Sequence, residues 1–238
     1  MNNGKRTIGI LGGMGPLATA DLFQKITLLT DAETDRDHIR VYIDSNANIP
    51  DRTAAILSHG EDPVPEMASA LRNLEKCGAD CIIMPCNTAH YFLPRLQAMT
   101  EIPFLSILTA AADACRTQFP GKTAGILGTT GTLSANLYQK ALNQAGIPYV
   151  TPSESEQKAL MRVIYNGVKA GKSPDSYRAD FLTVLEGMLA RGAEVFLLGC
   201  TELPLAAEAL GITLPTVDPT AELAKAAIRF CGYRVRGE

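Results

Sequence analysis

The chain repeats its own first half. The segment TIGILG at residues 7–12 returns as TAGILG at 123–128, 116 residues later, and GPLA at 15–18 returns as GTLS. Further along, GAD and CNT between residues 78 and 88 return as GAE and CTE between 192 and 202, at an offset of 114. Two matched pairs at nearly one offset indicate a duplicated unit of about 115 residues, and such a repeat constrains the fold more than any composition.

Each unit alternates short apolar runs with amphipathic stretches of helical length, which is typical of βα units on a parallel sheet. The expected strands are Thr7–Leu11, Arg40–Ile43, Cys81–Met84, Phe104–Ile107, Thr123–Leu127, Tyr149–Val150, Val195–Leu198 and Leu214–Val217. The expected helices are Leu17–Thr30, Pro65–Lys76, His90–Met99, Leu108–Gln118, Leu133–Gln144, Glu154–Ala170, Asp175–Ala190 and Thr220–Phe230.

The pattern predicts an α/β fold of two similar doubly wound parallel-sheet domains, related by the duplication and a pseudo-twofold axis. At about 150 residues per domain, 238 residues allow either one large domain or two small ones, and the repeat selects two. We expect residues 1–106 with 219–238 to form the first lobe, because the last helix crosses back, and residues 107–218 to form the second.

Composition excludes several classes of protein. With 46% hydrophobic and 20% charged residues the chain is neither disordered nor fibrous, and a net charge of −3 without a basic stripe argues against nucleic acid as a partner. The N-terminal apolar stretch is too short for a signal peptide or a membrane span, so we expect a cytoplasmic protein with no membrane partner. Its six cysteines are then expected to be reduced, and none has the spacing of a zinc or thioredoxin motif.

Glycine-rich turns follow the first strand of each unit. The turn at 12–16 fits the loose dinucleotide pattern G-x-G-x-x-A, but the acid expected on a ribose about 20 residues later is missing. The second unit has GTTGT at the equivalent turn, so both turns offer backbone N–H groups and a helix N-terminus to an anion such as a carboxylate.

Two cysteines, Cys86 and Cys200, occupy equivalent places in the repeat. Each follows an apolar strand pattern and precedes a segment able to start a helix, and ligands bind at the carboxyl ends of strands in open α/β sheets. We expect the helix N-terminus to lower the pKa of each thiol and favour the thiolate. The other four cysteines are interpreted as buried packing residues.

Two thiols facing one cleft from opposite sides would suit inversion of a carbon centre, since one can remove a proton and the other return it to the far face. A nucleophilic role would require a base beside one thiol, and only His90 is near. A disulfide or metal role lacks further ligands at suitable spacing, so no metal is expected. Arg52 and Lys169, 117 residues apart and so close to the repeat offset, are candidate cations for substrate carboxylates.

Four motifs carry a family resemblance: ILGGMGP at 10–16, IPDRT at 49–53, MPCNTAH at 84–90 and LGCTELP at 198–204. Over nearly the whole chain, the sequence resembles the aspartate/glutamate racemases in their aspartate racemase branch. The resemblance implies an amino-acid racemase that uses no pyridoxal or other cofactor, with two α/β domains, a cleft between them and a homodimeric assembly.

The resemblance also implies roles for individual residues. Cys86 and Cys200 would be the two catalytic bases, and Arg52 and Lys169 would bind the carboxylates. The amino acid's backbone groups would be bound by Met14, Asn87, Thr88, Thr129, Thr132 and Thr201. The glutamate racemases of peptidoglycan synthesis differ, with Asp-Ser in the first loop and His after the second Cys-Thr. Here Glu202 takes the place of that histidine and is a possible support for the thiol.

The leading hypothesis is racemisation of aspartate, with glutamate as another possible substrate. One rival is a one-cysteine isomerase or hydrolase of a related dicarboxylate such as maleate, which would form a covalent adduct at one thiol only. The other is a non-enzymatic amino-acid binding protein with inert thiols, whose thermal stabilisation by ligand would survive loss of both cysteines.

Overall fold

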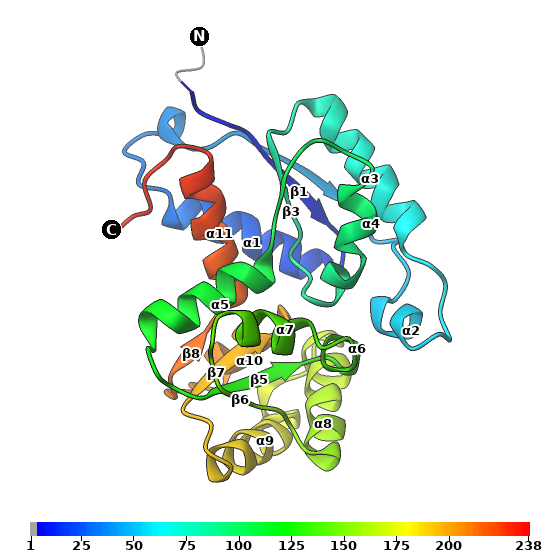
Figure 1. The fold of residues 1–238 in the computed structure, drawn as a ribbon, viewed down its shortest axis with the longest axis vertical. Helices are drawn as coiled ribbons and strands as arrows, with labels where there is room; N and C mark the ends of the chain where they lie inside the picture. The colour runs from blue at the N-terminus through cyan, green and yellow to red at the C-terminus, as the bar shows by residue number, and fades with distance from the viewer. Residues whose placement is uncertain (1–3) are drawn as a thin grey trace. The chain divides into compact units, whose positions relative to one another are not determined.

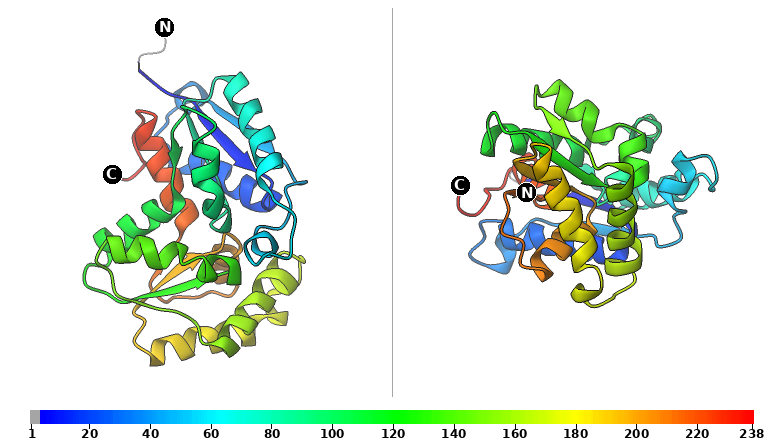
Figure 2. Two further views of the ribbon diagram at one scale, coloured as in Figure 1. Left: turned by 45° about the vertical axis from the view of Figure 1, so that its right-hand side comes forward. Right: turned by 90° about the horizontal axis from the view of Figure 1, so that it is seen from below.

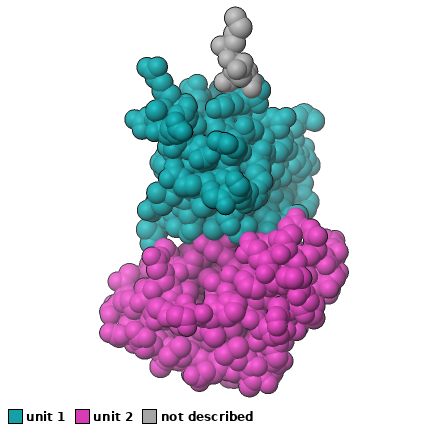
Figure 3. Space-filling model, turned by 90° about the vertical axis from the view of Figure 1, so that its left-hand side faces the viewer, with its two compact units in different colours: residues 1–110, 220–238 teal, residues 111–219 magenta. Residues whose placement is uncertain are grey.

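The computed structural model describes residues 4–238, which divide into two compact units (Figure 3). One unit contains the described residues up to Ala110 together with Thr220–Glu238, and the other contains Ala111–Pro219. The chain leaves the first unit within helix α5 (Ile107–Gln118) and returns to it along helix α11 (Pro219–Phe230).

The first unit is built on a four-stranded parallel sheet in the order β2-β1-β3-β4 (Figure 1). Its strands are β1 (Ile8–Gly12), β2 (Val41–Ser45), β3 (Cys81–Ile83) and β4 (Phe104–Leu105). Its helices, besides α5 and α11, are α1 (Pro16–Leu29), α2 (Arg52–Ile56), α3 (Val64–Cys77) and α4 (Leu93–Gln97), with short 3-10 helices at Asp35–Asp37 and Thr88–Phe92.

Side chains that alternate along β1 and β3 cover the two faces of this sheet, as the period of a strand requires. Ile8 and Ile10 pack with α1 and α11 on one face, in a cluster with Leu22 and Leu223. Leu11 and the alternate β3 residue Ile82 pack with α3 and α4 on the other face. Helices on both faces make the unit doubly wound.

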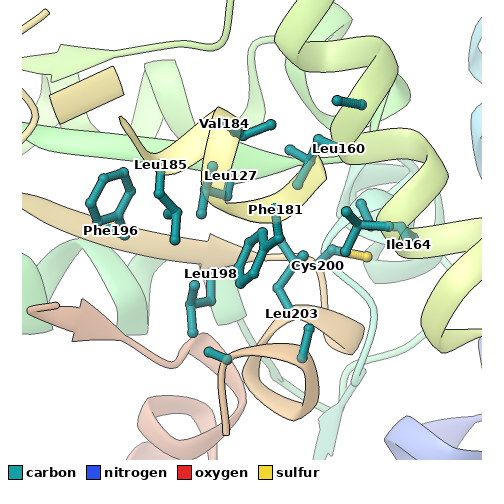
Figure 4. Close-up of a cluster of buried hydrophobic side chains, with 14 of the residues drawn as sticks. Leu127, Leu160, Ile164, Phe181, Val184, Leu185, Phe196, Leu198, Cys200 and Leu203 are labelled. Carbon is teal, nitrogen blue, oxygen red and sulfur yellow. The ribbon is translucent and has the colours of Figure 1, made fainter. Parts of the chain in front are cut away.

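The second unit repeats this topology, with a parallel sheet in the order β6-β5-β7-β8. Its strands are β5 (Ala124–Gly128), β6 (Tyr149–Val150), β7 (Val195–Gly199) and β8 (Thr216–Val217). Its helices are α6 (Thr130–Ser134), α7 (Leu137–Gln144), α8 (Glu154–Met161), α9 (Arg178–Ala190) and α10 (Glu202–Ala209), with a 3-10 helix at Pro174–Ser176. A cluster that includes Leu127, Phe181, Phe196 and Leu198 packs β5 and β7 against α8, α9 and α10 (Figure 4). The predicted fold class is therefore confirmed.

Helix α8 continues without a break into a π-helix, Arg162–Val168 (Figure 2). The sequence predicts a single helix over 154–170, so the change of winding is new information. Gly167 lies in the π-helix, where an added Cβ would lie 2.6 Å from Cδ1 of Tyr177. A glycine at this position lets the aromatic ring pack directly on the backbone.

Two predicted helices are interrupted in the structure, and a third begins later than predicted. The helix expected over His90–Met99 is a 3-10 helix followed by α4, because Pro94 has no N–H to donate to the His90 carbonyl and so breaks the α-helical pattern. The helix expected over Leu133–Gln144 is divided into α6 and α7 at Asn136, whose φ of 54° is left-handed. The helix expected over Asp175–Ala190 begins only at Arg178.

The prediction also omitted helices α2 and α10. Arg52, which we expected in a loop, is the first residue of α2, whose N-cap Asp51 accepts a hydrogen bond from the Ala54 N–H at 2.8 Å. Among the described residues no helix is both long and apolar enough to cross a bilayer.

Candidate functional site

Cys86 follows β3 by three residues and is 7% exposed. The next two residues, Asn87 and Thr88, are buried as well, and Thr88 begins a 3-10 helix. Met14 and Ile49 belong to the same buried cluster as Cys86, so the glycine turn after β1 and the segment before Arg52 pack on the thiol loop.

His90 fixes this loop rather than serving the thiol. Its Nδ1 lies 2.9 Å from the Cys86 carbonyl, and its Nε2 accepts the Ile107 N–H at 3.2 Å. Because Nε2 accepts, the proton of the neutral ring lies on Nδ1. Burial lowers the pKa of His90 to about 4, although the hydrogen bond to Cys86 opposes the shift. His90 is therefore a neutral structural link between the Cys86 loop and the start of α5.

Arg52 lies against the glycine turn. Its Nη1 donates to the carbonyls of Ile49 and Pro50, at 3.1 and 2.9 Å, and its Nη2 lies 3.5 Å from the Met14 carbonyl. The turn itself is held by Thr19, whose hydroxyl accepts the Gly13 N–H at 2.9 Å. Gly13 has a φ of 91°, and a Cβ there would lie 2.2 Å from the Asn46 carbonyl oxygen. The structure thus brings Met14 and Arg52 together within the first unit.

Cys200 is the residue directly after β7, is 6% exposed and precedes α10. Its sulfur lies near Ile164 of the π-helix, and both residues pack in one cluster with Leu203 of α10 (Figure 4). The thiol donates to Oε2 of Glu202 at 2.9 Å. The Thr201 hydroxyl donates to the same oxygen at 3.2 Å.

The pKa of the Cys200 thiol is raised well above its ordinary value. Burial is the largest cause, the Glu202 charge adds to it, and the Lys169 ammonium opposes it without cancelling it. Our expectation that a helix N-terminus would lower this pKa is wrong for Cys200, because the thiol is buried and lies beside the Glu202 carboxylate at the start of α10. The resting side chain is a thiol.

Lys169 follows the π-helix, and its backbone N–H donates to the Ile164 carbonyl at 3.0 Å. The ammonium lies 3.6 Å from Oε1 of Glu202 and 4.8 Å from the centre of the Tyr165 ring. The structure therefore joins Lys169, Glu202, Cys200 and Thr201 in one polar group.

Thr129 and Thr132 lie in the turn after β5. The Thr129 hydroxyl caps α6 by accepting the Thr132 N–H at 3.2 Å, and the two hydroxyls are 3.1 Å apart. Both residues are buried. Gly128 and Gly199 are partners in the β5–β7 register, so this turn and Cys200 follow adjacent strands.

The arrangement recurs in both units. In each sheet one central strand ends in the glycine turn, and the strand paired beside it leads to the cysteine. A surface hollow of about 610 Å³ in the second unit is lined by Thr130, Gln157 and Met161 among others, and by none of the predicted site residues. Among the described residues no group of three or more His, Cys, Asp or Glu side chains could hold a metal ion.

Sequence reasoning missed the π-helix that positions Lys169 and the structural role of His90. Glycine within an apolar helical segment was the available signal for the first. The second has no local signal in the sequence, because the partner of Nε2 is the Ile107 N–H, 17 residues away.

Comparison with known proteins identifies the family of this chain. The family model described as Asp/Glu/Hydantoin racemase matches residues 11–227. The chain belongs to this family. The broad specificity amino-acid racemase RacX of Bacillus subtilis is 30% identical over 227 residues, covering 93% of this chain and 96% of that protein. The family identified from the sequence motifs is confirmed, and so is the expectation, at the level of the family, of an amino-acid racemase.

Solved structures agree with this assignment. An aspartate racemase of Picrophilus torridus superposes with a TM-score of 0.84 at 32% identity, covering 97% of this chain and 96% of that one. A glutamate racemase of Francisella tularensis, solved in complex with D-glutamate, has a TM-score of 0.68 at 18% identity, covering 95% and 81% of the two chains. The second likeness shows the fold alone.

Proposed function

We propose that this family member racemises an acidic amino acid, aspartate in the first place and glutamate in the second, by a two-base mechanism that uses Cys86 and Cys200 and needs no cofactor. The observation that carries the proposal is the repeated placement of a buried cysteine beyond equivalent strands of two sheets with the same strand order. The aspartate racemase of Picrophilus torridus and the broad specificity racemase RacX support the substrate class.

In the proposed reaction one cysteine acts as a thiolate and the other as a thiol. The thiolate takes the Cα proton, so that a Cα–H bond breaks and an S–H bond forms, and the electron pair is left on Cα. The other thiol then protonates Cα on the opposite face and becomes a thiolate. The mechanism requires the two sulfurs to reach opposite faces of one substrate carbon.

The substrate's carboxylates bear much of the charge that develops at Cα, so the groups that bind them also stabilise the transition state. We propose Arg52 and Lys169 as the cations for these carboxylates. Met14, Asn87, Thr88, Thr129, Thr132 and Thr201 are proposed to bind the amino acid's backbone groups, alongside the N–H groups of the two turns. Proton transfer by a positioned side chain typically contributes about 10²–10⁴-fold to the rate, so each thiol should matter at that scale.

The test is exchange of the Cα proton in deuterium oxide, followed separately for each enantiomer of aspartate and glutamate. Wild-type protein should exchange and racemise at least one of the two acids. Cys86→Ala and Cys200→Ala should each lower racemisation by about 10²–10⁴-fold, while one enantiomer continues to exchange in each variant.

The prediction that Cys77 is a buried packing residue is wrong, because this cysteine is exposed at the end of α3. Cys77→Ala is therefore the matched control. Wild-type protein that neither exchanges nor racemises either acid would end the proposal. Racemisation that survives loss of either thiol would refute the two-base mechanism.

A further inference from the structure

The carboxylate of Glu202 is the centre of a buried polar group in the second unit. The residue is 7% exposed, and three partners from different positions face it: the Cys200 thiol at 2.9 Å, the Thr201 hydroxyl at 3.2 Å and the Lys169 ammonium at 3.6 Å. Burying a carboxylate is costly without a counter-charge, and Lys169 supplies one.

Among the described residues, the first unit shows no carboxylate hydrogen-bonded to its thiol. In the repeat, Cys86-Asn87-Thr88 aligns with Cys200-Thr201-Glu202, so a neutral threonine occupies the place of the glutamate. His90 is the nearby titratable side chain, and its neutral ring is engaged with the Cys86 carbonyl and the Ile107 N–H. The two thiols share a fold position but differ in their electrostatic surroundings.

A carboxylate 2.9 Å from the sulfur opposes a second negative charge there, so the proton stays on Cys200. The charged and titratable groups that face Cys200 are Glu202 of α10, Lys169 beyond the π-helix and Tyr138 of α7. Tyr138 is fully buried and faces Cys115 and Asp218 as well. Lys169 is therefore the cation that can weaken the effect of Glu202 on this thiol.

We propose that Glu202 is a positioning residue that keeps Cys200 in the proton-donating form, and that Lys169 sets how firmly it does so. The inference rests on the proposed two-base racemisation. In the resting enzyme Cys200 is then protonated and ready to donate its proton. Cys200 becomes a base only after it has protonated Cα, when its S–H bond breaks as the new Cα–H bond forms and a thiolate is left beside Glu202 and Lys169.

This asymmetry has a defined kinetic consequence. Racemisation of a free amino acid has an equilibrium constant of one, so kcat/KM must be equal for the two enantiomers at every pH. A difference in resting protonation between the two thiols can therefore change kcat and KM for each enantiomer, but not the equality of the two kcat/KM values. Loss of Glu202 should therefore change the ratio of the two kcat values and leave the kcat/KM values equal to each other.

The decisive experiment titrates the Cys200 thiolate by its ultraviolet absorbance, taken as the difference between each protein and its Cys200→Ser partner. Glu202→Gln removes the negative charge and should shift the titration by at least one pH unit toward lower pH, which is a tenfold rise in thiolate below the midpoint. Lys169→Met should shift it in the opposite direction. Glu202→Asp should restore part of the wild-type behaviour, and Glu208→Gln, an exposed glutamate of the same helix, is the control.

Opposite shifts separate an electrostatic role from a structural one, because general loosening of the site would move both titrations the same way. An unchanged midpoint in Glu202→Gln, or shifts of the same sign in Glu202→Gln and Lys169→Met, would overturn the inference. The titration requires no turnover, so it gives an answer even if the protein fails to racemise aspartate and glutamate. If racemisation is present and the ratio of kcat values is unchanged in a folded Glu202→Gln protein, the asymmetry is likewise refuted.

Discussion

The buried imidazole of His90 makes the stability of the first unit depend on pH in a way that one substitution can isolate. The ring is 4% exposed, holds the Cys86 loop through Nδ1 and accepts the Ile107 N–H through Nε2. Protonation would place a second proton on Nε2, opposite an N–H donor, in a site closed to water. The neutral ring is therefore the form that the fold accepts.

The magnitude follows from the pKa of about 4 in the folded protein, against an ordinary value of 6.5. Between pH 6.5 and pH 4 the unfolded chain binds a proton that the folded chain does not, so the free energy of unfolding falls as the pH falls. At 1.36 kcal/mol per pH unit the loss is about 3 kcal/mol, complete near pH 4 and absent above pH 6.5.

His90→Gln removes the titration and leaves a side chain that can donate and accept. At pH 7 it should be less stable than wild type by about 1–3 kcal/mol, because two buried hydrogen bonds are disturbed. As the pH falls to 4 this difference should shrink by about 3 kcal/mol, so the variant approaches or overtakes wild type.

The assay is urea denaturation of both proteins at intervals between pH 7 and pH 4. Subtracting the variant from wild type removes the contribution of the carboxylates that both share. His59→Gln is the control, since it removes an exposed histidine from the same unit. NMR titration of the His90 ring in wild-type protein provides a second measurement that does not depend on a stable variant. A difference that stays constant within about 1 kcal/mol across this range, or a ring that titrates above pH 6, would refute the reasoning.

Three further predictions concern the segments that support the candidate site. Arg191 holds the pKa of the mostly buried Glu156 at about 2, so Glu156→Gln should lower the free energy of unfolding by about 2–3 kcal/mol at pH 7. Urea denaturation repeated from pH 4.5 down to pH 2 should show this difference disappear. Gly187→Ala would place a Cβ 1.9 Å from Oε1 of Glu156 and should lower the melting temperature, an effect that a double-mutant cycle with Glu156→Ala should find strongly reduced. Thr19→Val removes the acceptor for the Gly13 N–H and should destabilise the first unit by about 1–3 kcal/mol, measured by urea denaturation.

The fold could be predicted closely from the sequence because the apolar strand patterns are local and occur in both copies of the repeat. β6 is predicted to the residue, and the ends of the other seven strands lie within two residues of the predicted ones. The repeat also located both cysteines beyond strand ends. The helix predictions failed where a single residue broke a helix that the hydrophobic periodicity indicated. Pro94 lacks the N–H that an α-helix needs, and Asn136 has a left-handed conformation.

The state of the Cys200 thiol could not be predicted in the same way. The rule that a helix N-terminus lowers the pKa of a nearby thiol considers only the backbone. The pKa of Cys200 also depends on the side chain of Glu202 and on the distance from Lys169 to that carboxylate. Lys169 directly follows the π-helix, in which Gly167 lies against the Tyr177 ring. A contact between residues 33 positions apart, one of them placed at the end of a change in helical winding, has no local signature in the sequence.

Duplication and divergence together account for the two thiols. Copying a βα unit places cysteines beyond equivalent strands, because strand order and register are inherited with the fold. Duplication does not make the surroundings of the two cysteines equal. In the repeat, Thr88 aligns with Glu202 and His90 aligns with Pro204. A two-base racemase does not need equal thiols: its equilibrium constant constrains kcat/KM for the two enantiomers, not the resting protonation of either base. Divergence at these two positions can therefore give one proton donor a fixed resting state without favouring either product at equilibrium.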